Sequence, residues 1–356
     1  MMNYNGWDRE YLENKELYYE LFDKAMAKEP EGPTEELEQA FRDYTGRKHC
    51  VPVSSATDAL YFSLKAHGIG PGWQVFVTGF SWISTASCIS MAGAMPVFCD
   101  IDPDSYHMTL ESVKKMKRNG NCALIYTHLF GNMTDTTEIE NYCKENDIIF
   151  IEDAAQSLGV SLNGRKAGTI GECSSYSFNG NKVIAGISGG GMFMTDDDQI
   201  AKTVRMLAKH GKDKDFAMLG YNSKMYNFNA DVILHRFQFM EQWQKRRQEI
   251  AEEYDYAFNG LVKTPQKHDN HNYHKYVIQF EDKETRKRNE IKKALGGSVH
   301  YERVIPDNSM YNYIQYRSGY CSVARHTAYT VLSLPIHAWL KDEEIEHVIN
   351  TVALRV

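Results

Sequence analysis

The sequence predicts an α/β fold, in which a large domain with a mostly parallel sheet precedes a smaller C-terminal α+β domain. Between residues 47 and 235, short apolar runs alternate with helical segments, as in strands joined by helical crossovers. The pattern then changes, starting with a long charged amphipathic segment at 236–259. Because 356 residues are also many for a single core, we expect two domains, at 1–235 and 236–356.

The expected elements follow one another along the chain. Residues 8–28 have helical character, and Thr34 can cap a second helix that ends at Gly46. The expected strands of the large domain are HCVPVS, WQVFVTG, MPVFCDI, CALIYTHL, DIIFIED, SSYSFN and GGMFMTD, with helices at TDALYFSLKAHG, STASCISMAG and TTEIENYCKEN. In the C-terminal part, KYVIQFE and SVHYERV resemble strands, and TRKRNEIKKALGG and KDEEIEHVINTVA resemble helices.

The composition argues against several classes of protein. A net charge of −7 argues against a broad nucleic-acid surface, although it leaves room for a local phosphate pocket. The seven cysteines form no CxxC pair, which argues against a disulfide framework and a structural zinc site. No apolar run approaches the roughly 18 residues of a membrane span, and the first residues lack the apolar core of a signal peptide. We expect a cytoplasmic protein that binds neither nucleic acid nor membrane.

Polar features follow several predicted strands of the large domain, at the edge where open parallel sheets bind ligands. The first, SSATDAL, opens a helix whose free N–H groups can hold a phosphate, and Ser55 and Thr57 add hydroxyl groups. An ordinary helix cap would look the same. The second is Trp82, which can stack on a flat ring or can pack in a core or an interface.

Two further features carry charge. Asp153 ends the buried run IIFIED, where a carboxylate can keep a pyridine nitrogen protonated or can cap a helix, and Gln156 lies about one helical turn further. Lys182 leaves SYSFN in an Asn-Gly-Asn turn and precedes Gly189–Gly191, which let the backbone pass close to a neighbour. A lysine attacks a carbonyl only as the free amine, and burial lowers its pKa towards neutrality. Taken alone, Lys182 would read as a solvated loop lysine.

Together these features supply a phosphate cradle, a stacking ring, a partner for a pyridine nitrogen and a lysine for a Schiff base. Pyridoxal 5'-phosphate requires this set, so we expect that cofactor. A dinucleotide-binding dehydrogenase also fits an α/β pattern, but no GxGxxG follows the first strand.

The chain resembles the DegT/DnrJ/StrS family of sugar aminotransferases, which belong to fold type I of the pyridoxal phosphate enzymes, like aspartate aminotransferase. The matching stretches include SSATDAL, FSWISTASCISMAGAMPVFCDIDPDSY, IEDAAQSLGVSLNGRKAGTIGECSSYSFNGNK, LGYNSKM and SLPIH. The resemblance implies Lys182 as the Schiff-base lysine and Asp153 on the pyridine nitrogen. It assigns the remaining cofactor contacts to Ala56, Thr57 and Ser177 at the phosphate, Trp82 on the ring face, Gln156 at the ring hydroxyl, and Asn222 at the phosphate of a second subunit.

The resemblance also implies transfer of an amino group from L-glutamate to a nucleotide-linked keto sugar, by a homodimer with shared active sites. FNGNKVI resembles most the enzymes that aminate carbon 4 of 4-keto-6-deoxy hexoses. A 3-keto sugar aminotransferase and a non-catalytic regulator on the same fold are the alternatives. His300 and Tyr301 match a pair near the substrate of similar enzymes, and His337 follows a proline. Substrate contact and a structural role are equally open for these residues.

Overall fold

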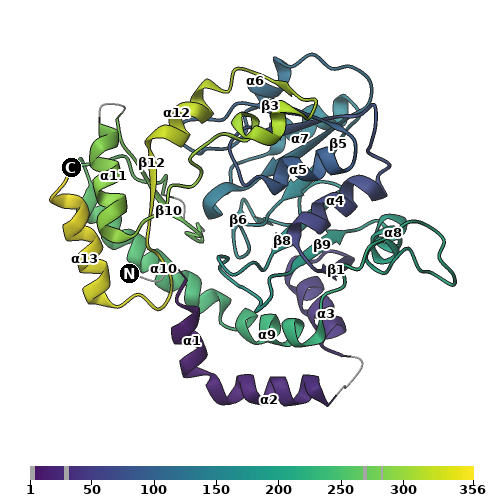
Figure 1. Cartoon of the computed structure of the whole chain (residues 1–356), viewed down its shortest axis with the longest axis horizontal. Coiled ribbons are helices and arrows are strands. Elements are labelled where there is room, and N and C mark those ends of the chain that lie inside the picture. Colours follow the sequence, from purple (N-terminus) through teal and green to yellow (C-terminus); the bar gives the residue numbers. More distant parts are fainter. Residues whose placement is uncertain (1–4, 28–31, 268–270, 282–283) are drawn as a thin grey trace.

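An eight-stranded sheet forms the centre of the larger part of the molecule in the computed structural model, which describes residues 5–27, 32–267, 271–281 and 284–356 (Figure 1). Five of the seven neighbouring strand pairs are parallel, which confirms the mostly parallel sheet expected from the sequence. In spatial order the strands are β1 (His49–Val53), β9 (Gly191–Thr195), β8 (Cys173–Ser177), β5 (Ile148–Asp153), β4 (Cys122–Thr127), β2 (Gln74–Thr78), β3 (Met95–Cys99) and β11 (Arg317–Ser318).

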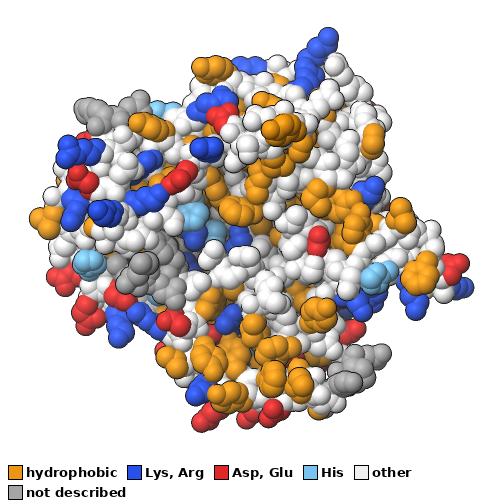
Figure 2. All heavy atoms as spheres, viewed as in Figure 1, with side chains coloured by type: hydrophobic (Ala, Val, Ile, Leu, Met, Phe, Trp, Pro, Cys, Tyr) orange, Lys and Arg blue, Asp and Glu red, His pale blue; other side chains and the backbone are white. Residues whose placement is uncertain are grey.

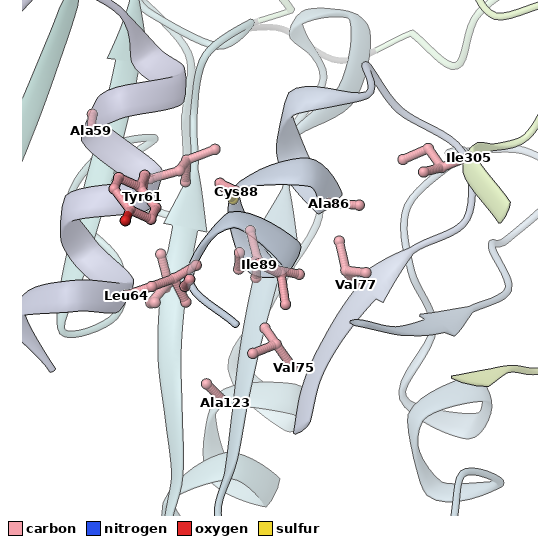
Figure 3. Packing of buried hydrophobic residues seen from close by; sticks show 14 of the residues in the cluster. Ala59, Tyr61, Leu64, Val75, Val77, Ala86, Cys88, Ile89, Ala123 and Ile305 are labelled. Carbon is pink, nitrogen blue, oxygen red and sulfur yellow. The ribbon is translucent and has the colours of Figure 1, made fainter. Parts of the chain in front are cut away.

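Both faces of the sheet are covered because alternate side chains of a strand point to opposite faces. In β2, Val75 and Val77 pack in one hydrophobic cluster and Phe76 in another. Figure 3 shows the first cluster, in which Ile89 of the helix lies over Val75 of the strand. The helices over the first cluster are α4 (Ala56–Ala66), α5 (Ser84–Met91) and α8 (Asp198–Ala208); those over the second are α3 (Pro33–Thr45), α7 (Thr137–Glu145) and α9 (Asn227–Phe237).

The N-terminal region departs from the expected pattern in two places. Two helices, α1 (Trp7–Glu13) and α2 (Lys15–Met26), replace the single helix expected at 8–28, and residue 28 lies outside the described residues. Gly32 rather than Thr34 is the N-cap of α3, because the helix already begins at Pro33, which tolerates the first position. Gly46 ends α3 in a left-handed conformation, as expected (φ 76°). In Figure 1, α2 lies along α9.

A third hydrophobic cluster holds the smaller part together. Its elements are α10 (Met240–Phe258), α11 (Thr285–Leu295), α13 (Asp342–Ala353) and the antiparallel pair of β10 (Tyr276–Gln279) and β12 (Val331–Leu334). The expected helix at 236–259 is divided, because α9 ends at Phe237 and α10 begins at Met240. SVHYERV forms no strand; within it, only Ser298 makes an isolated bridge, to Ser333.

The C-terminal part also returns to the large sheet. Strand β11 pairs with β3, and Ile305, Cys321 and Ala324 pack in the first hydrophobic cluster. The segment around α12 (Ser322–Thr330) therefore belongs with the large sheet by its packing, so the domain division at residue 236 stays a prediction. None of the helices in the described residues is long and apolar enough to cross a membrane.

Candidate active site

A cavity of about 270 Å³ lies at the carboxyl ends of β5 and β8, beside the N-terminus of α4. This is the edge of the sheet where the sequence predicted a ligand site. In Figure 2, basic and histidine side chains gather near the centre of the face, between the two parts of the molecule. The predicted site residues that line the cavity are Ser55, Ala56, Thr57, Trp82, Asp153, Gln156, Ser177, Lys182, His300 and Tyr301.

One end of the cavity is suited to a phosphate. Ser55 caps α4, because its hydroxyl accepts a hydrogen bond from the backbone N–H of Asp58 (3.1 Å). The first turn of α4 then presents backbone N–H groups and the positive end of the helix dipole to the cavity. Gly191 lets β9 pass close by, since a Cβ there would lie 2.4 Å from the carbonyl carbon of Ser55 and 2.5 Å from the nitrogen of Ala56. The close approach expected for this glycine run is thus confirmed at Gly191.

Asp153 is the last residue of β5, and its carboxylate is buried (3% exposed). Thr85 Oγ1 donates to one oxygen (2.8 Å), and the backbone N–H of Ala155 donates to the other (3.1 Å). Burial raises the pKa of Asp153, and the two hydrogen bonds and the charge of Lys182 oppose the rise. A cationic N–H brought into this cavity would replace the water that the carboxylate has lost.

Lys182 enters the cavity from the turn that follows β8, and its backbone N–H donates to Asn179 O (2.9 Å). Burial lowers the pKa of Lys182 to about 8, and only the nearby Asp153 opposes this shift. The turn is held from outside by the N-terminal segment, because Trp7 Nε1 donates to Gly180 O (2.6 Å) and Asn5 Nδ2 donates to the same oxygen (3.0 Å). The N-terminal helices therefore fix the turn that carries the lysine.

Gln156 is hydrogen-bonded to two other segments around the cavity. Its Oε1 accepts a hydrogen bond from the backbone N–H of Phe130 (2.9 Å), and its Nε2 donates to the hydroxyl of Tyr301 (3.1 Å). The ring of Tyr301 stacks on Phe130, with centroids 6.1 Å apart, and lies 6.3 Å from the ring of Trp82. His300, the neighbour of Tyr301, pairs through Nδ1 with Ser333 Oγ (2.9 Å), and burial lowers its pKa to about 3. Both members of the His-Tyr pair thus reach the cavity.

Sequence reasoning missed His274 and Lys275, which also line the cavity. His274 Nε2 donates to Asn181 O (2.9 Å), and its Nδ1 lies 3.1 Å from Gln156 Oε1. Burial, with the charges of Lys182 and Lys275, lowers the pKa of His274 well below its usual value. The signal was present in NYHKYV, where His274 precedes the expected strand KYVIQFE and Lys275 begins it, but the sheet-edge argument concerns only residues that follow strands.

Two predicted site residues lie elsewhere. Asn222 is exposed and lines a separate hollow of about 570 Å³, together with Thr34 and Lys224. His337 is buried (1% exposed) outside the cavity, where its Nδ1 accepts a hydrogen bond from the backbone N–H of Trp339 (3.2 Å). Of the two roles that the sequence left open for His337, this placement favours the structural one over substrate contact. Trp82 does line the cavity, but 59% of it is exposed, so its stacking face is open in this chain.

The lining of the cavity fits pyridoxal 5'-phosphate. A helix N-terminus approached by a glycine backbone suits the phosphate, a buried carboxylate suits the ring nitrogen, and an amine of lowered pKa suits the aldehyde. The three groups come from separate elements, α4, β5 and the turn after β8, yet they line one cavity. The arrangement can bind a carbonyl cofactor covalently and hold its ring in a charged form.

Comparisons with known proteins agree with this chemistry. Residues 20–353 match the model of the DegT/DnrJ/EryC1/StrS aminotransferase family. The chain is 31% identical to the pleiotropic regulatory protein of Geobacillus stearothermophilus, over 89% of this chain and 87% of that protein. It is 30% identical to the UDP-2-acetamido-2-deoxy-3-oxo-D-glucuronate aminotransferase of Pseudomonas aeruginosa, over 87% of each chain.

The fold is shared with solved structures. A DegT/DnrJ/EryC1/StrS aminotransferase from Brucella abortus superposes with a TM-score of 0.91 and 26% identity, over 99% of each chain. These findings exclude the dinucleotide-binding dehydrogenase that the α/β pattern alone left open. The chain belongs to the DegT/DnrJ/EryC1/StrS aminotransferase family, the enzymes of which depend on pyridoxal phosphate.

Proposed function

We propose that this protein transfers an amino group from L-glutamate to a nucleotide-linked keto sugar, for the biosynthesis of amino sugars and polysaccharides. The observation that carries the proposal is one cavity that holds the amine of Lys182, the buried carboxylate of Asp153 and the N-terminus of α4. The name of the Pseudomonas aeruginosa relative, an aminotransferase of a UDP-linked oxo sugar, supports the substrate class.

Pyridoxal 5'-phosphate, when bound, supplies an electron sink and carries the amino group between the two substrates. Asp153 would keep the ring nitrogen protonated, because a buried carboxylate favours a cation beside it. Trp82 would cover the ring face and Gln156, fixed by Phe130 and Tyr301, would contact the ring hydroxyl. The phosphate would be held by Ser55, Ala56, Thr57 and Ser177.

Lys182 would have two roles. It would bond covalently to the cofactor as a free amine, and a pKa of about 8 leaves roughly a tenth of it free at pH 7, against about one part in 3,000 for an ordinary lysine. As a free amine beside the donor substrate, Lys182 would take a proton from the donor's α-carbon as a general base and return it as a general acid. His274 is a poorer candidate for this proton transfer, because its Nε2 already donates a hydrogen bond to Asn181 O.

The position of the keto group on the sugar is a finer proposal. The FNGNKVI stretch supports a 4-keto-6-deoxy hexose. A 3-keto sugar is the second candidate, because the name of the Pseudomonas aeruginosa relative places the oxo group at carbon 3. The name of the Geobacillus relative, a regulatory protein, supports the alternative of a non-catalytic regulator. The cavity with Lys182 and Asp153 favours catalysis instead.

We further propose a homodimer in which Asn222 of one chain completes the site of the other. Asn222 is exposed, and it lies in the segment after α8 that projects from the body of the molecule (Figure 1). The proposed compartment is the cytoplasm, because all seven cysteines are buried and free, as is usual in reducing surroundings.

The proposed function is tested first by absorbance spectroscopy and then by identifying the product. The purified protein, loaded with pyridoxal phosphate, should absorb in the visible range, and L-glutamate should bleach that band. Incubation with glutamate and a panel of nucleotide-linked 3-keto and 4-keto sugars, read by mass spectrometry, should give one aminated sugar. A band that glutamate leaves unchanged would contradict the proposed function and favour the regulator.

A further inference from the structure

A second lysine, Lys275, is built into the wall of the active-site cavity. It directly precedes β10, and its backbone N–H donates to Phe130 O (3.2 Å). Three residues earlier, Asn272 Nδ2 donates to Gln156 O (3.0 Å) and Leu158 O (2.9 Å). The segment that carries Lys275 is therefore tied to the same elements that carry Gln156, so the position of Lys275 in the cavity is fixed by the backbone.

The ammonium group of Lys275 has no anionic partner in the described part of the chain. The residue is 7% exposed, and no hydrogen bond or ion pair reaches its Nζ from any described residue. The charged groups that act on it are Arg247 and Lys182, both positive, and its own charge lowers the pKa of His300 and His274. Burial, together with these two charges, lowers the pKa of Lys275 to about 7. A buried cation among cations is costly unless something negative joins it.

We propose that Lys275 binds a carboxylate of a substrate that enters the cavity, and so selects for acidic substrates. The proposal rests on the proposed function, since it concerns ligands of the same site. The only acidic side chain among the described residues that line the cavity is Asp153, which already accepts hydrogen bonds from Thr85 and Ala155. An incoming carboxylate would therefore pair with Lys275, which none of the described side chains neutralises.

Two substrates can bring that carboxylate. One is the amino donor, L-glutamate, which carries two carboxylates. The other is a nucleotide-linked uronic acid, whose carboxylate sits on the sugar ring. Both share the chemistry that Lys275 recognises, and they can be told apart by ligands that present the carboxylate on only one side of the reaction.

The experiment compares wild-type holoenzyme with Lys275→Gln and Lys275→Met. Neither change should prevent folding, because each removes a positive charge from the neighbourhood of Arg247 and Lys182. Lys263→Gln is the matched control, since Lys263 also precedes β10 in the chain but pairs with Asp104 (2.6 Å) outside the cavity. Binding of glutarate, which lacks an amine and cannot react, is measured by calorimetry, and L-glutamate is titrated by the bleaching of the visible band.

For the sugar arm, calorimetry compares UDP-glucuronate with UDP-glucose, which differ only in the carboxylate. If the donor supplies the carboxylate, both Lys275 variants should bind glutarate and glutamate about 10- to 100-fold more weakly, the usual range for a lost charge-assisted hydrogen bond. If the sugar supplies it, wild type should prefer UDP-glucuronate and the variants should lose that preference. Lys263→Gln should match wild type in both arms.

Unchanged affinities in both arms would overturn the inference. A parallel loss of pyridoxal phosphate affinity in the Lys275 variants would also overturn it, because the lysine would then serve the cofactor. Failure of the proposed function is visible separately, as a wild-type band that glutamate does not bleach while carboxylate binding still depends on Lys275.

Discussion

Asp153→Asn is the substitution that tests the assigned chemistry most directly. Asparagine has nearly the same shape as aspartate, and its side-chain oxygen can still accept a hydrogen bond from the N–H of Ala155 or from Thr85 Oγ1. What the change removes is the negative charge beside the ring nitrogen of the cofactor. We expect the variant to bind pyridoxal phosphate through Lys182 and the phosphate end of the cavity, and to lose most of its turnover.

The size of the loss follows from the burial of Asp153. Breaking a buried ion pair by removing one partner costs about 3–5 kcal/mol. At 1.36 kcal/mol for each factor of ten, turnover should fall about 100- to 5,000-fold. The apoprotein should not be destabilised, because burial raises the pKa of Asp153. The native state binds this proton more tightly than the unfolded chain does, so ionisation above about pH 4 destabilises the native apoprotein, and asparagine removes that cost.

The assay measures turnover with a sugar substrate, cofactor binding by absorbance, and the melting temperature of the apoprotein. The control is Glu152→Gln, since Glu152 is a fully buried carboxylate next to Asp153 that accepts hydrogen bonds from the backbone N–H of Gly168 (2.6 Å) and Ile170 (2.7 Å), away from the cavity. That variant should lose stability and keep turnover within about twofold. Wild-type turnover in Asp153→Asn would refute the assignment, because another group would then be holding the ring nitrogen.

Three further predictions can be checked with the same protein. Borohydride reduction of the holoenzyme and peptide mapping should find the pyridoxyl label on Lys182, and the rate of cofactor attachment to the apoprotein should rise about tenfold per pH unit up to about pH 8 and then level off; a label elsewhere, or a rise continuing to pH 10, would contradict this. Exchange between glutamate and oxaloacetate should be slow, because no arginine is among the described residues that line the cavity; fast exchange would show a second carboxylate site. Random mixing of Lys182→Ala with Asn222→Asp should restore about a quarter of wild-type activity, since half the dimers are mixed and each has one intact site; mixing without recovery would end the shared-site model.

The residues that could be predicted from the sequence share one property. Asp153 ends one buried strand and Lys182 follows another, and the sequence marks both strands by continuous apolar or β-forming runs. In a parallel sheet the ends of such strands meet at one edge, so the order of elements alone brings their side chains together. The same logic placed the first turn of α4 opposite them. Periodicity and strand order were sufficient for this half of the cavity.

The other half of the cavity depends on contacts between residues far apart in the chain, and no local sequence pattern indicates such contacts. His274 and Lys275 precede β10 in the smaller part, and they reach the cavity because Asn272 is hydrogen-bonded to the backbone of Gln156 and Leu158. Trp7 holds the turn of Lys182 from 173 residues away in the chain. Such pairings depend on how two parts pack, and hydrophobic patterning does not specify that packing. The return of β11 to the large sheet escaped prediction for the same reason, since a strand of two residues has no periodicity.

Asn222 lies where a residue that serves the active site of a second subunit would lie, outside the cavity of its own chain. Its backbone pairs with Lys209 beyond the end of α8, and its exposed side chain lines another hollow and not the cavity of its own chain. Trp82, which does reach that cavity, is 59% exposed, so the cavity is open on the side that carries its proposed stacking face. An open side on the cavity and a projecting segment on the same chain are the two halves that a two-fold dimer would join. The mixed-variant experiment therefore tests geometry rather than resemblance: recovery of activity requires that the lesion at 222 and the lesion at 182 fall in different sites of one dimer.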